Sequence, residues 1–167
     1  DDDVEDDIAT KKNLKRFHSK NISRDEEVGC KKRFFSAGAN MRAVLVANPK
    51  GGAGKTTLAT NLSGYFANKG KKVTLCDLDR QQSSLRWMAF RDPVMAPVTG
   101  YFAGNQIVLN LPQEADWAVL DAPAGLQGYK LSDYLRTVDK VLVPLVPSVF
   151  DMAATEDFLN SMRGELR

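Results

Sequence analysis

The 167-residue chain has few of the residues on which metal centres, disulfide frameworks and histidine catalysis depend. Its two cysteines, Cys30 and Cys76, lie too far apart in sequence to form a metal-binding or redox motif. The single histidine, His18, lies in a charged N-terminal segment, so catalysis by histidine is excluded. This low cysteine content fits a reducing compartment such as the cytoplasm.

Strong net charge and long hydrophobic runs are absent as well. The net charge is +2 at pH 7, so composition alone favours neither a nucleic-acid-binding protein nor a membrane-surface protein. Apolar runs such as residues 141–146 are far too short to span a bilayer, and the acidic start of the chain is unlike a signal peptide. We therefore expect a cytoplasmic protein that does not bind membranes.

The first forty residues differ in composition from the rest. They hold nine acidic and nine basic residues and few aliphatic ones, which favours disorder over a packed core. Because Met41 immediately precedes the first apolar run, we expect residues 1–40 to be an appended extension with no part in the chemistry. The alternative is a natural regulatory or DNA-contacting tail, with a basic patch made of Lys11, Lys12, Lys15 and Arg16.

From Met41 onward, apolar runs alternate with helical patterns. Strands are predicted at residues 43–47, 72–77, 115–121 and 141–146, with a short strand at 98–102. Helices are predicted at 56–68, at 83–90 and from Asp151 onward, while 105–111 fits either helix or strand. The alternation predicts one α/β domain over residues 41–167, with a mostly parallel sheet and helices on both faces in three α/β/α layers.

A glycine-rich loop joins the first predicted strand to the first predicted helix. It reads Lys50-Gly51-Gly52-Ala53-Gly54-Lys55-Thr56-Thr57. Strand, glycine-rich loop and helix are the context of a phosphate-binding loop, where backbone N–H groups and the helix N-terminus surround phosphate oxygens. Lys55 adds a full positive charge, and the Thr56 hydroxyl is a suitable Mg²⁺ ligand. The sequence therefore predicts a site for a nucleoside phosphate at residues 51–57.

The exact form of this loop narrows the class of protein. The pattern G-x-x-x-x-G-K-[ST] fails because Pro49 occupies its first glycine position, whereas K-G-G-x-G-K-[ST]-T matches and includes a second lysine, Lys50. This deviant Walker A motif resembles that of the ParA/MinD family of P-loop partitioning ATPases, nearest the ParA branch. A dinucleotide-binding fingerprint is excluded, since no third glycine follows at the required spacing, and the Asn-Lys-x-Asp motif of GTPases is missing.

Two aspartates at the end of the second predicted strand extend this resemblance. Asp77 and Asp79 form a D-x-D-x-Q segment similar to the family's first switch. The carboxyl ends of parallel strands are where ligands bind in α/β sheets. The resemblance implies that Asp79 positions or polarises the attacking water, and that Asp77 serves the outer shell of the metal or a hydrogen bond of the loop. A helix cap or a turn is the structural alternative for both acids.

Residues 117–125 resemble the family's Walker B strand and second switch. The resemblance implies that Asp121 holds Mg²⁺, usually through water, and that the N–H of Gly125 contacts the γ-phosphate. Ala124 stands where the family often has a second proline, which loosens the turn but keeps this backbone donor.

The resemblance implies an ATP- and Mg²⁺-dependent dimeric switch. Lys50, Lys55 and Asp79 would be its catalytic residues, with Lys50 reaching the partner's nucleotide across the dimer like an arginine finger. The implied role is DNA partitioning or cargo positioning, with non-specific DNA and a ParB-like stimulating protein as partners. A metabolic enzyme on the same fold and a fragment defective in nucleotide binding are the alternatives. The fragment remains an alternative because family members continue through at least one more strand and helix. We therefore expect the domain to be incomplete at its C-terminus.

Overall fold

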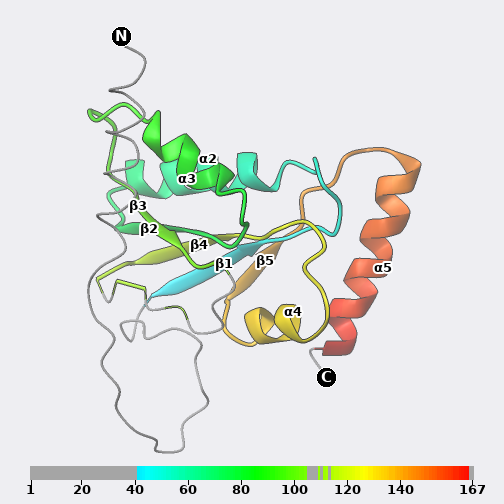
Figure 1. Cartoon of the computed structure of the whole chain (residues 1–167). Coiled ribbons are helices and arrows are strands. Elements are labelled where there is room, and N and C mark those ends of the chain that lie inside the picture. The colour runs from blue at the N-terminus through cyan, green and yellow to red at the C-terminus, as the bar shows by residue number, and fades with distance from the viewer. Residues whose placement is uncertain (1–40, 105–108, 110, 113, 166–167) are drawn as a thin grey trace, which may run out of the picture. The chain divides into compact units, whose positions relative to one another are not determined.

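The computed structural model describes residues 41–104, 109, 111–112 and 114–165 (Figure 1). The elements within these residues are β1 (Arg42–Val46), α2 (Lys55–Asn68), β2 (Val73–Asp77), α3 (Ser83–Ala89), β3 (Thr99–Phe102), β4 (Trp117–Asp121), α4 (Gly128–Leu135), β5 (Lys140–Leu142) and α5 (Val149–Glu165). The expected extension at 1–40 and most of the ambiguous segment 105–111 lie outside the described residues. No helix in the described part of the chain is both long enough and apolar enough to cross a lipid bilayer.

The five strands form one sheet in the order β3-β2-β4-β1-β5, and every pairing between neighbours is parallel. In the register of this sheet, Asp121 at the end of β4 lies beside Val46 of β1 and beside Asp77 of β2. The carboxyl ends of the three central strands are therefore level with one another. The predicted parallel α/β architecture is confirmed.

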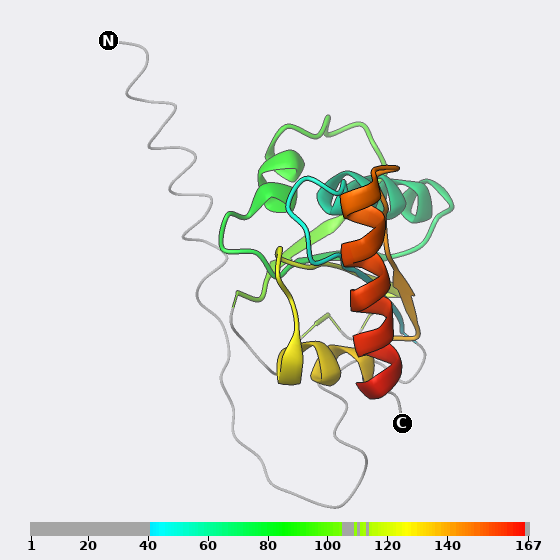
Figure 2. The same ribbon diagram turned by 90° about the vertical axis from the view of Figure 1, so that its right-hand side faces the viewer.

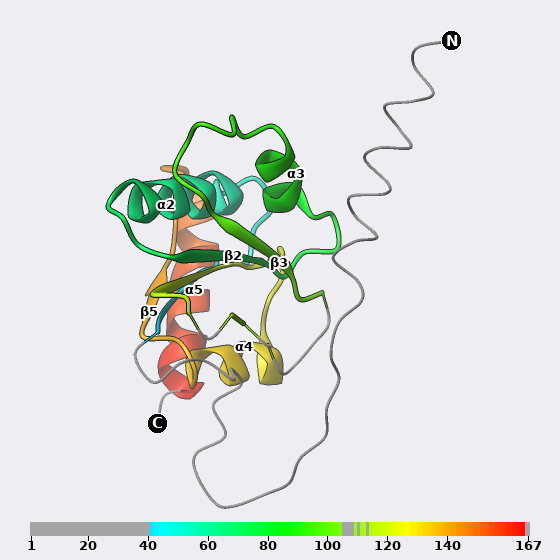
Figure 3. The ribbon, with the colours of Figure 1, turned by 90° about the vertical axis from the view of Figure 1, so that its left-hand side faces the viewer.

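Helices cover both faces of the sheet, with α2 and α3 on one side and α4 and α5 on the other (Figures 1 and 3). Successive residues of a strand point to opposite faces, so Val46 and Val119 pack beneath α2 and α3. Leu45 and Leu120 join the other cluster, to which α5 contributes Phe158. Burial on both faces explains why the central strands are continuous apolar runs.

The structure corrects three predictions about individual elements. Helix α4 was not predicted, because it has only eight residues and lies close to glycines. Strand β5 ends at Leu142 and not at 146, just before a segment that contains Pro144. Helix α5 begins two residues before Asp151, because the Ser148 hydroxyl accepts the N–H of Asp151 at 3.2 Å and so caps the helix.

Candidate nucleotide-binding site

The glycine-rich loop lies between the end of β1 and the start of α2, at the carboxyl edge of the sheet. Gly52 and Gly54 have φ angles of +76° and +82°, a region that side chains with a Cβ atom rarely adopt. Apart from the flanking residues, no heavy atom lies within 4 Å of where a Cβ would stand at either glycine, so backbone conformation and not space requires them. The Gly54 carbonyl accepts the first helical bond of α2, from Leu58 at 2.9 Å. The loop therefore leads directly into a helix N-terminus, as an anion site requires.

Lys55, the first residue of α2, is a buried lysine that turns back onto the loop. Its Nζ donates to the carbonyl oxygen of Lys50 at 2.7 Å. Burial lowers the pKa of Lys55, and the nearby carboxylates of Asp121 and Asp79 oppose that shift. The structure thus brings together three of the predicted site residues, from the start of α2, the end of β4 and the turn after β2.

Asp121 provides the test of whether the site fits Mg²⁺. Its side chain is only 2% exposed, and its Oδ1 atom has no hydrogen-bond partner. Burial raises the pKa of Asp121 to about 6, although a hydrogen bond with the Thr56 side chain opposes the rise. A buried carboxylate oxygen without a partner, beside a threonine hydroxyl, forms the oxygen-only environment that Mg²⁺ prefers. The residues therefore fit the ion, although within the described ranges no three Asp, Glu, His or Cys side chains form a complete cage.

Asp77 is fully buried and acts as a cap for α3. Its Oδ2 accepts hydrogen bonds from the N–H and the hydroxyl of Ser84, at 3.0 and 2.6 Å, and its Oδ1 accepts the N–H of Asp79 at 2.9 Å. Of the interpretations given for Asp77, the structure shows the helix cap and, through the Asp79 N–H, the turn. A place in the outer shell of the metal stays a prediction.

Asp79 and Gly125, the residues of the two predicted switches, both make contacts within the chain. The Asp79 Oδ1 accepts the N–H of Gln81 at 3.0 Å, which closes a tight turn. The N–H of Gly125 donates to the carbonyl of Pro49 at 2.9 Å, so the second switch lies against the phosphate loop. The N–H predicted to contact a γ-phosphate therefore already has an acceptor in this structure.

Lys50 extends to α5 of its own chain. Its Nζ forms an ion pair with Asp151 Oδ1 at 2.9 Å, and the other carboxylate oxygen accepts a hydrogen bond from the Ser148 hydroxyl. The hydrogen bond with Ser148 and the ion pair with Lys50 both lower the pKa of Asp151. The reach of Lys50 across a dimer stays a prediction, and it would require the release of this ion pair.

Sequence reasoning missed two polar residues that connect the loop to α5. Asn48 and Thr155 are 2% and 5% exposed, and the Asn48 Nδ2 donates to the Thr155 Oγ1 at 3.2 Å. For Asn48, the one available signal was an amide side chain placed directly after an apolar strand and before the loop. Thr155 carries no comparable signal, because it reaches the loop only through the packing of α5.

Comparison with known proteins identifies the family. A sequence model described as the CobQ/CobB/MinD/ParA nucleotide binding domain (CbiA) matches residues 44–165. The chain belongs to this family. Three curated relatives are the maintenance of carboxysome distribution protein A of Halothiobacillus neapolitanus (33% identity; 67% of this chain and 54% of the relative), the protein ParA of Rhizobium radiobacter (33%; 66% and 51%) and the chromosome-partitioning ATPase Soj of Thermus thermophilus (47%; 32% and 21%).

Solved structures agree with this assignment of a MinD/ParA-type fold. A putative plasmid partition protein of Borrelia burgdorferi bound to AMPPNP superposes with a TM-score of 0.59 at 18% identity, covering 75% of this chain and 71% of that one. The septum site-determining protein MinD of Pyrococcus horikoshii in complex with Mg-ADP gives 0.57 at 20% identity, covering 74% and 65%. This chain spans about half the length of its carboxysome-distribution and ParA relatives.

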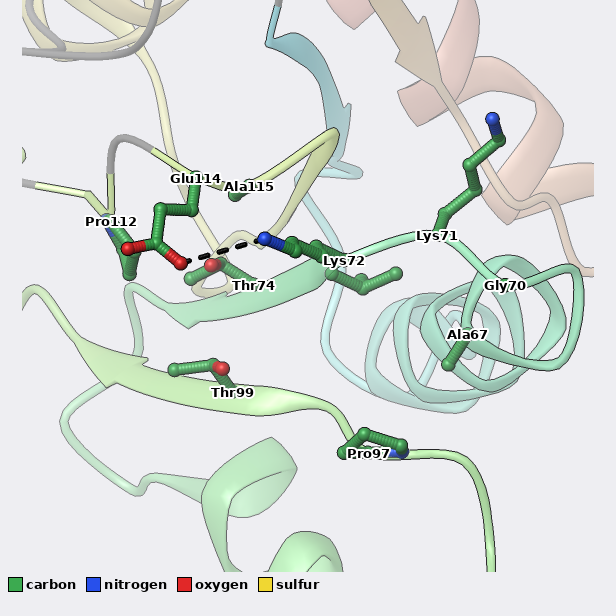
Figure 4. Close-up of a pocket in the computed structure, with 11 residues that line it drawn as sticks. Ala67, Gly70, Lys71, Lys72, Thr74, Pro97, Thr99, Pro112, Glu114 and Ala115 are labelled. Atoms are coloured by element: carbon green, nitrogen blue, oxygen red, sulfur yellow. Dashed lines mark ion pairs between the residues drawn. The ribbon is translucent and has the colours of Figure 1, made fainter.

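A pocket of about 310 Å³ also opens on this MinD/ParA-type domain, at the opposite end of the sheet (Figure 4). Thr74 and Thr99 line it, and the side chain of Lys72 points across it to Glu114 at 3.5 Å. Because Thr74 lies near the start of β2 and Asp77 at its end, this pocket is separate from the phosphate loop.

Proposed function

We propose that this domain is an ATP-binding and ATP-hydrolysing dimeric switch of the ParA type, acting in DNA partitioning or cargo positioning. The observation that carries the proposal is the convergence of Lys55, Thr56 and Asp121 at a glycine-rich loop, with one buried carboxylate oxygen left unpaired. The names of the relatives, which include a chromosome-partitioning ATPase and a carboxysome distribution protein, support this direction.

The loop and its neighbours would hold the phosphates of ATP. Backbone N–H groups of residues 51–57 would face the phosphate oxygens, and the Lys55 amine would exchange the Lys50 carbonyl for one of them. Thr56 and Asp121 would hold Mg²⁺, Asp121 through water. Bound Mg²⁺ supplies charge neutralisation and helps to orient the β- and γ-phosphates.

Three donors that would contact phosphate have other acceptors within this chain. Lys55 donates to the Lys50 carbonyl, Gly125 donates to the Pro49 carbonyl, and Lys50 pairs with Asp151. We infer that bound ATP would replace each of these acceptors with a phosphate oxygen. Asp79, at the same edge of the sheet, would then position the attacking water. Because the reaction depends on positioning and charge, turnover is expected to be slow, as suits a switch.

The proposal includes partners. ATP would join two copies face to face, with Lys50 contacting the partner's nucleotide, and hydrolysis would release them. Non-specific DNA and a ParB-like protein that stimulates hydrolysis fit a partitioning role in the cytoplasm.

ATPase activity and light scattering test the proposal together. Wild-type protein should hydrolyse ATP with Mg²⁺, form a dimer only with ATP, and respond to added DNA. Lys55→Ala should abolish turnover, and Lys50→Ala should abolish both turnover and the ATP-dependent dimer. Lys71→Ala, which changes an exposed lysine at the far end of the sheet, is the matched control and should behave as wild type.

Unchanged turnover in Lys55→Ala would contradict the enzymatic proposal. Turnover that is lost in Lys55→Ala, kept in Lys50→Ala and accompanied by no dimer would favour a monomeric enzyme on the same fold.

A further inference from the structure

Asn48 lies where the phosphate loop meets the segment after β5 and helix α5, about a hundred residues further along the chain. Its Oδ1 accepts the backbone N–H of Lys50 at 2.8 Å. Its Nδ2 donates to the carbonyl of Pro144 at 2.9 Å and to the Thr155 hydroxyl at 3.2 Å. One buried side chain therefore connects the phosphate loop, the segment after β5, and helix α5.

The chemistry of the partners fixes the orientation of this amide. A backbone N–H only donates and a carbonyl only accepts, so Lys50 must face Oδ1 and Pro144 must face Nδ2. With Thr155 as the third partner, both N–H groups and the oxygen of Asn48 are used. No other orientation of a buried amide at this position satisfies all three partners.

The same face of α5 contacts the loop a second time, one helical turn earlier. Asp151 and Thr155 are four residues apart and therefore lie on one side of the helix. Asp151 holds the side chain of Lys50, while Thr155 holds Asn48, which in turn holds the backbone of Lys50. Lys50 is thus fixed to α5 at both its side chain and its backbone, and α5 starts beside the loop and ends beside α4 (Figures 1 and 2).

We propose that Asn48, supported by Thr155, is a positioning residue that sets the pose of Lys50 relative to α5. It acts through the backbone of Lys50 and touches no phosphate. This inference rests on the proposed function for its effect on turnover, but the positioning itself is a property of the protein without nucleotide. A structural role in stability alone would not lower kcat while KM and the folded fraction stay unchanged.

Amide hydrogen exchange of the nucleotide-free protein tests the positioning directly. Asn48→Ala removes the acceptor of the Lys50 N–H, so exchange of that amide should become about tenfold faster. Thr155→Val keeps the shape of the side chain and removes only the hydroxyl, and about a threefold increase is expected. Thr155→Ser keeps the hydroxyl and should match wild type, as should Thr137→Val, whose hydroxyl bonds lie at the end of α4. Unchanged exchange at Lys50 in both Asn48→Ala and Thr155→Val would overturn the proposal.

A kinetic comparison tests whether positioning matters for turnover. Thr155→Val should lower kcat about fivefold with KM changed less than twofold, and Thr155→Ser should restore it. Circular dichroism should show the same folded fraction in Thr155→Val as in wild type, so that the lower kcat is not a loss of folded protein. A wild-type kcat in Thr155→Val, or a low kcat in Thr155→Ser as well, would overturn the link to turnover. If wild-type protein binds no nucleotide, the proposed function fails, while the exchange measurement still decides the positioning.

Discussion

Asp121 is a buried carboxylate whose ionised form is costly unless a metal ion lies beside it. The side chain is almost fully buried, one oxygen has no partner, and its pKa is raised to about 6. Without a bound metal ion, the folded protein therefore holds the ionised form of Asp121 at a cost, which the nearby charge of Lys55 only partly offsets. Such a cost is expected at a functional site, where the bound ligand offsets it.

Asp121→Asn should therefore stabilise the nucleotide-free protein at pH 7.5, by on the order of 2 kcal/mol. A raised acid pKa means that the folded state binds the proton more tightly than the unfolded state. That contribution is fully present below the unfolded pKa, near 3.9, and is lost as pH rises through about 6. The difference between variant and wild type should thus nearly vanish at pH 4. Urea unfolding at both pH values measures it, with the exposed Asp157→Asn as control. An equal difference at pH 4 and pH 7.5 would contradict the account.

Gln82 is the one non-glycine residue of the described chain with a positive φ, at +53°. It directly precedes α3, next to the turn formed by Asp79. Left-handed backbone costs a residue with a Cβ atom roughly 1 kcal/mol, so Gln82→Gly should raise the stability by up to about 1 kcal/mol and Gln82→Val should lower it by more. Thermal unfolding measures both variants. Gln81→Gly, at a neighbouring position without positive φ, should lower the stability. A gain in stability in Gln81→Gly as large as that in Gln82→Gly would show that the positive φ of Gln82 is not strained.

The motif residues could be assigned from sequence, but their partners within the chain could not. Lys55, Thr56, Asp79 and Asp121 lie at one edge of the sheet, as the strand–loop–helix pattern predicts. The contact of Lys50 with Asp151 joins positions about a hundred residues apart, as does each bond of Asn48 to the segment around α5. Such contacts follow from tertiary packing, which local patterns do not encode.

Among the helices and strands, the fully buried strands and the longer helices were the ones that could be predicted from the sequence. The central strands were predictable because burial on both faces makes them long apolar runs. Strand β5 was overestimated because residues 143–146 continue its apolar run, although Pro144 interrupts them and Pro147 follows them. Helix α4 was missed because eight residues give too short a period, although Leu131 and Leu135 are buried against the sheet.

Helix α5 depends on its N-terminal cap. Ser148→Ala removes the acceptor of the Asp151 N–H and the hydroxyl that donates to the Asp151 carboxylate, so we expect a loss of about 1 kcal/mol in the free energy of unfolding. Denaturant unfolding measures it. Ser148→Thr keeps the hydroxyl and should lose much less. A loss in Ser148→Thr as large as in Ser148→Ala would show that the cap does not stabilise α5.

At the scale of the whole domain, strand order determines which residues meet. The order β3-β2-β4-β1-β5 places β4 between β1 and β2, so the loops that follow these three strands share one edge. The phosphate loop follows β1, Asp79 lies in the loop after β2, and Asp121 is the last residue of β4, so residues far apart in sequence meet at this edge. The parallel direction of every strand is what converts three separate motifs into one site.

Isothermal titration of ATP, with and without Mg²⁺, tests the central claim most directly, because it measures the site without requiring dimerisation or turnover. Wild-type protein should show saturable binding that is stronger with Mg²⁺. Lys55→Ala should bind at least about tenfold more weakly, since it loses a buried charge that would contact phosphate, while Lys71→Ala should bind as wild type does. Equal affinity in Lys55→Ala and wild type, or wild-type binding that is indifferent to Mg²⁺, would contradict the account.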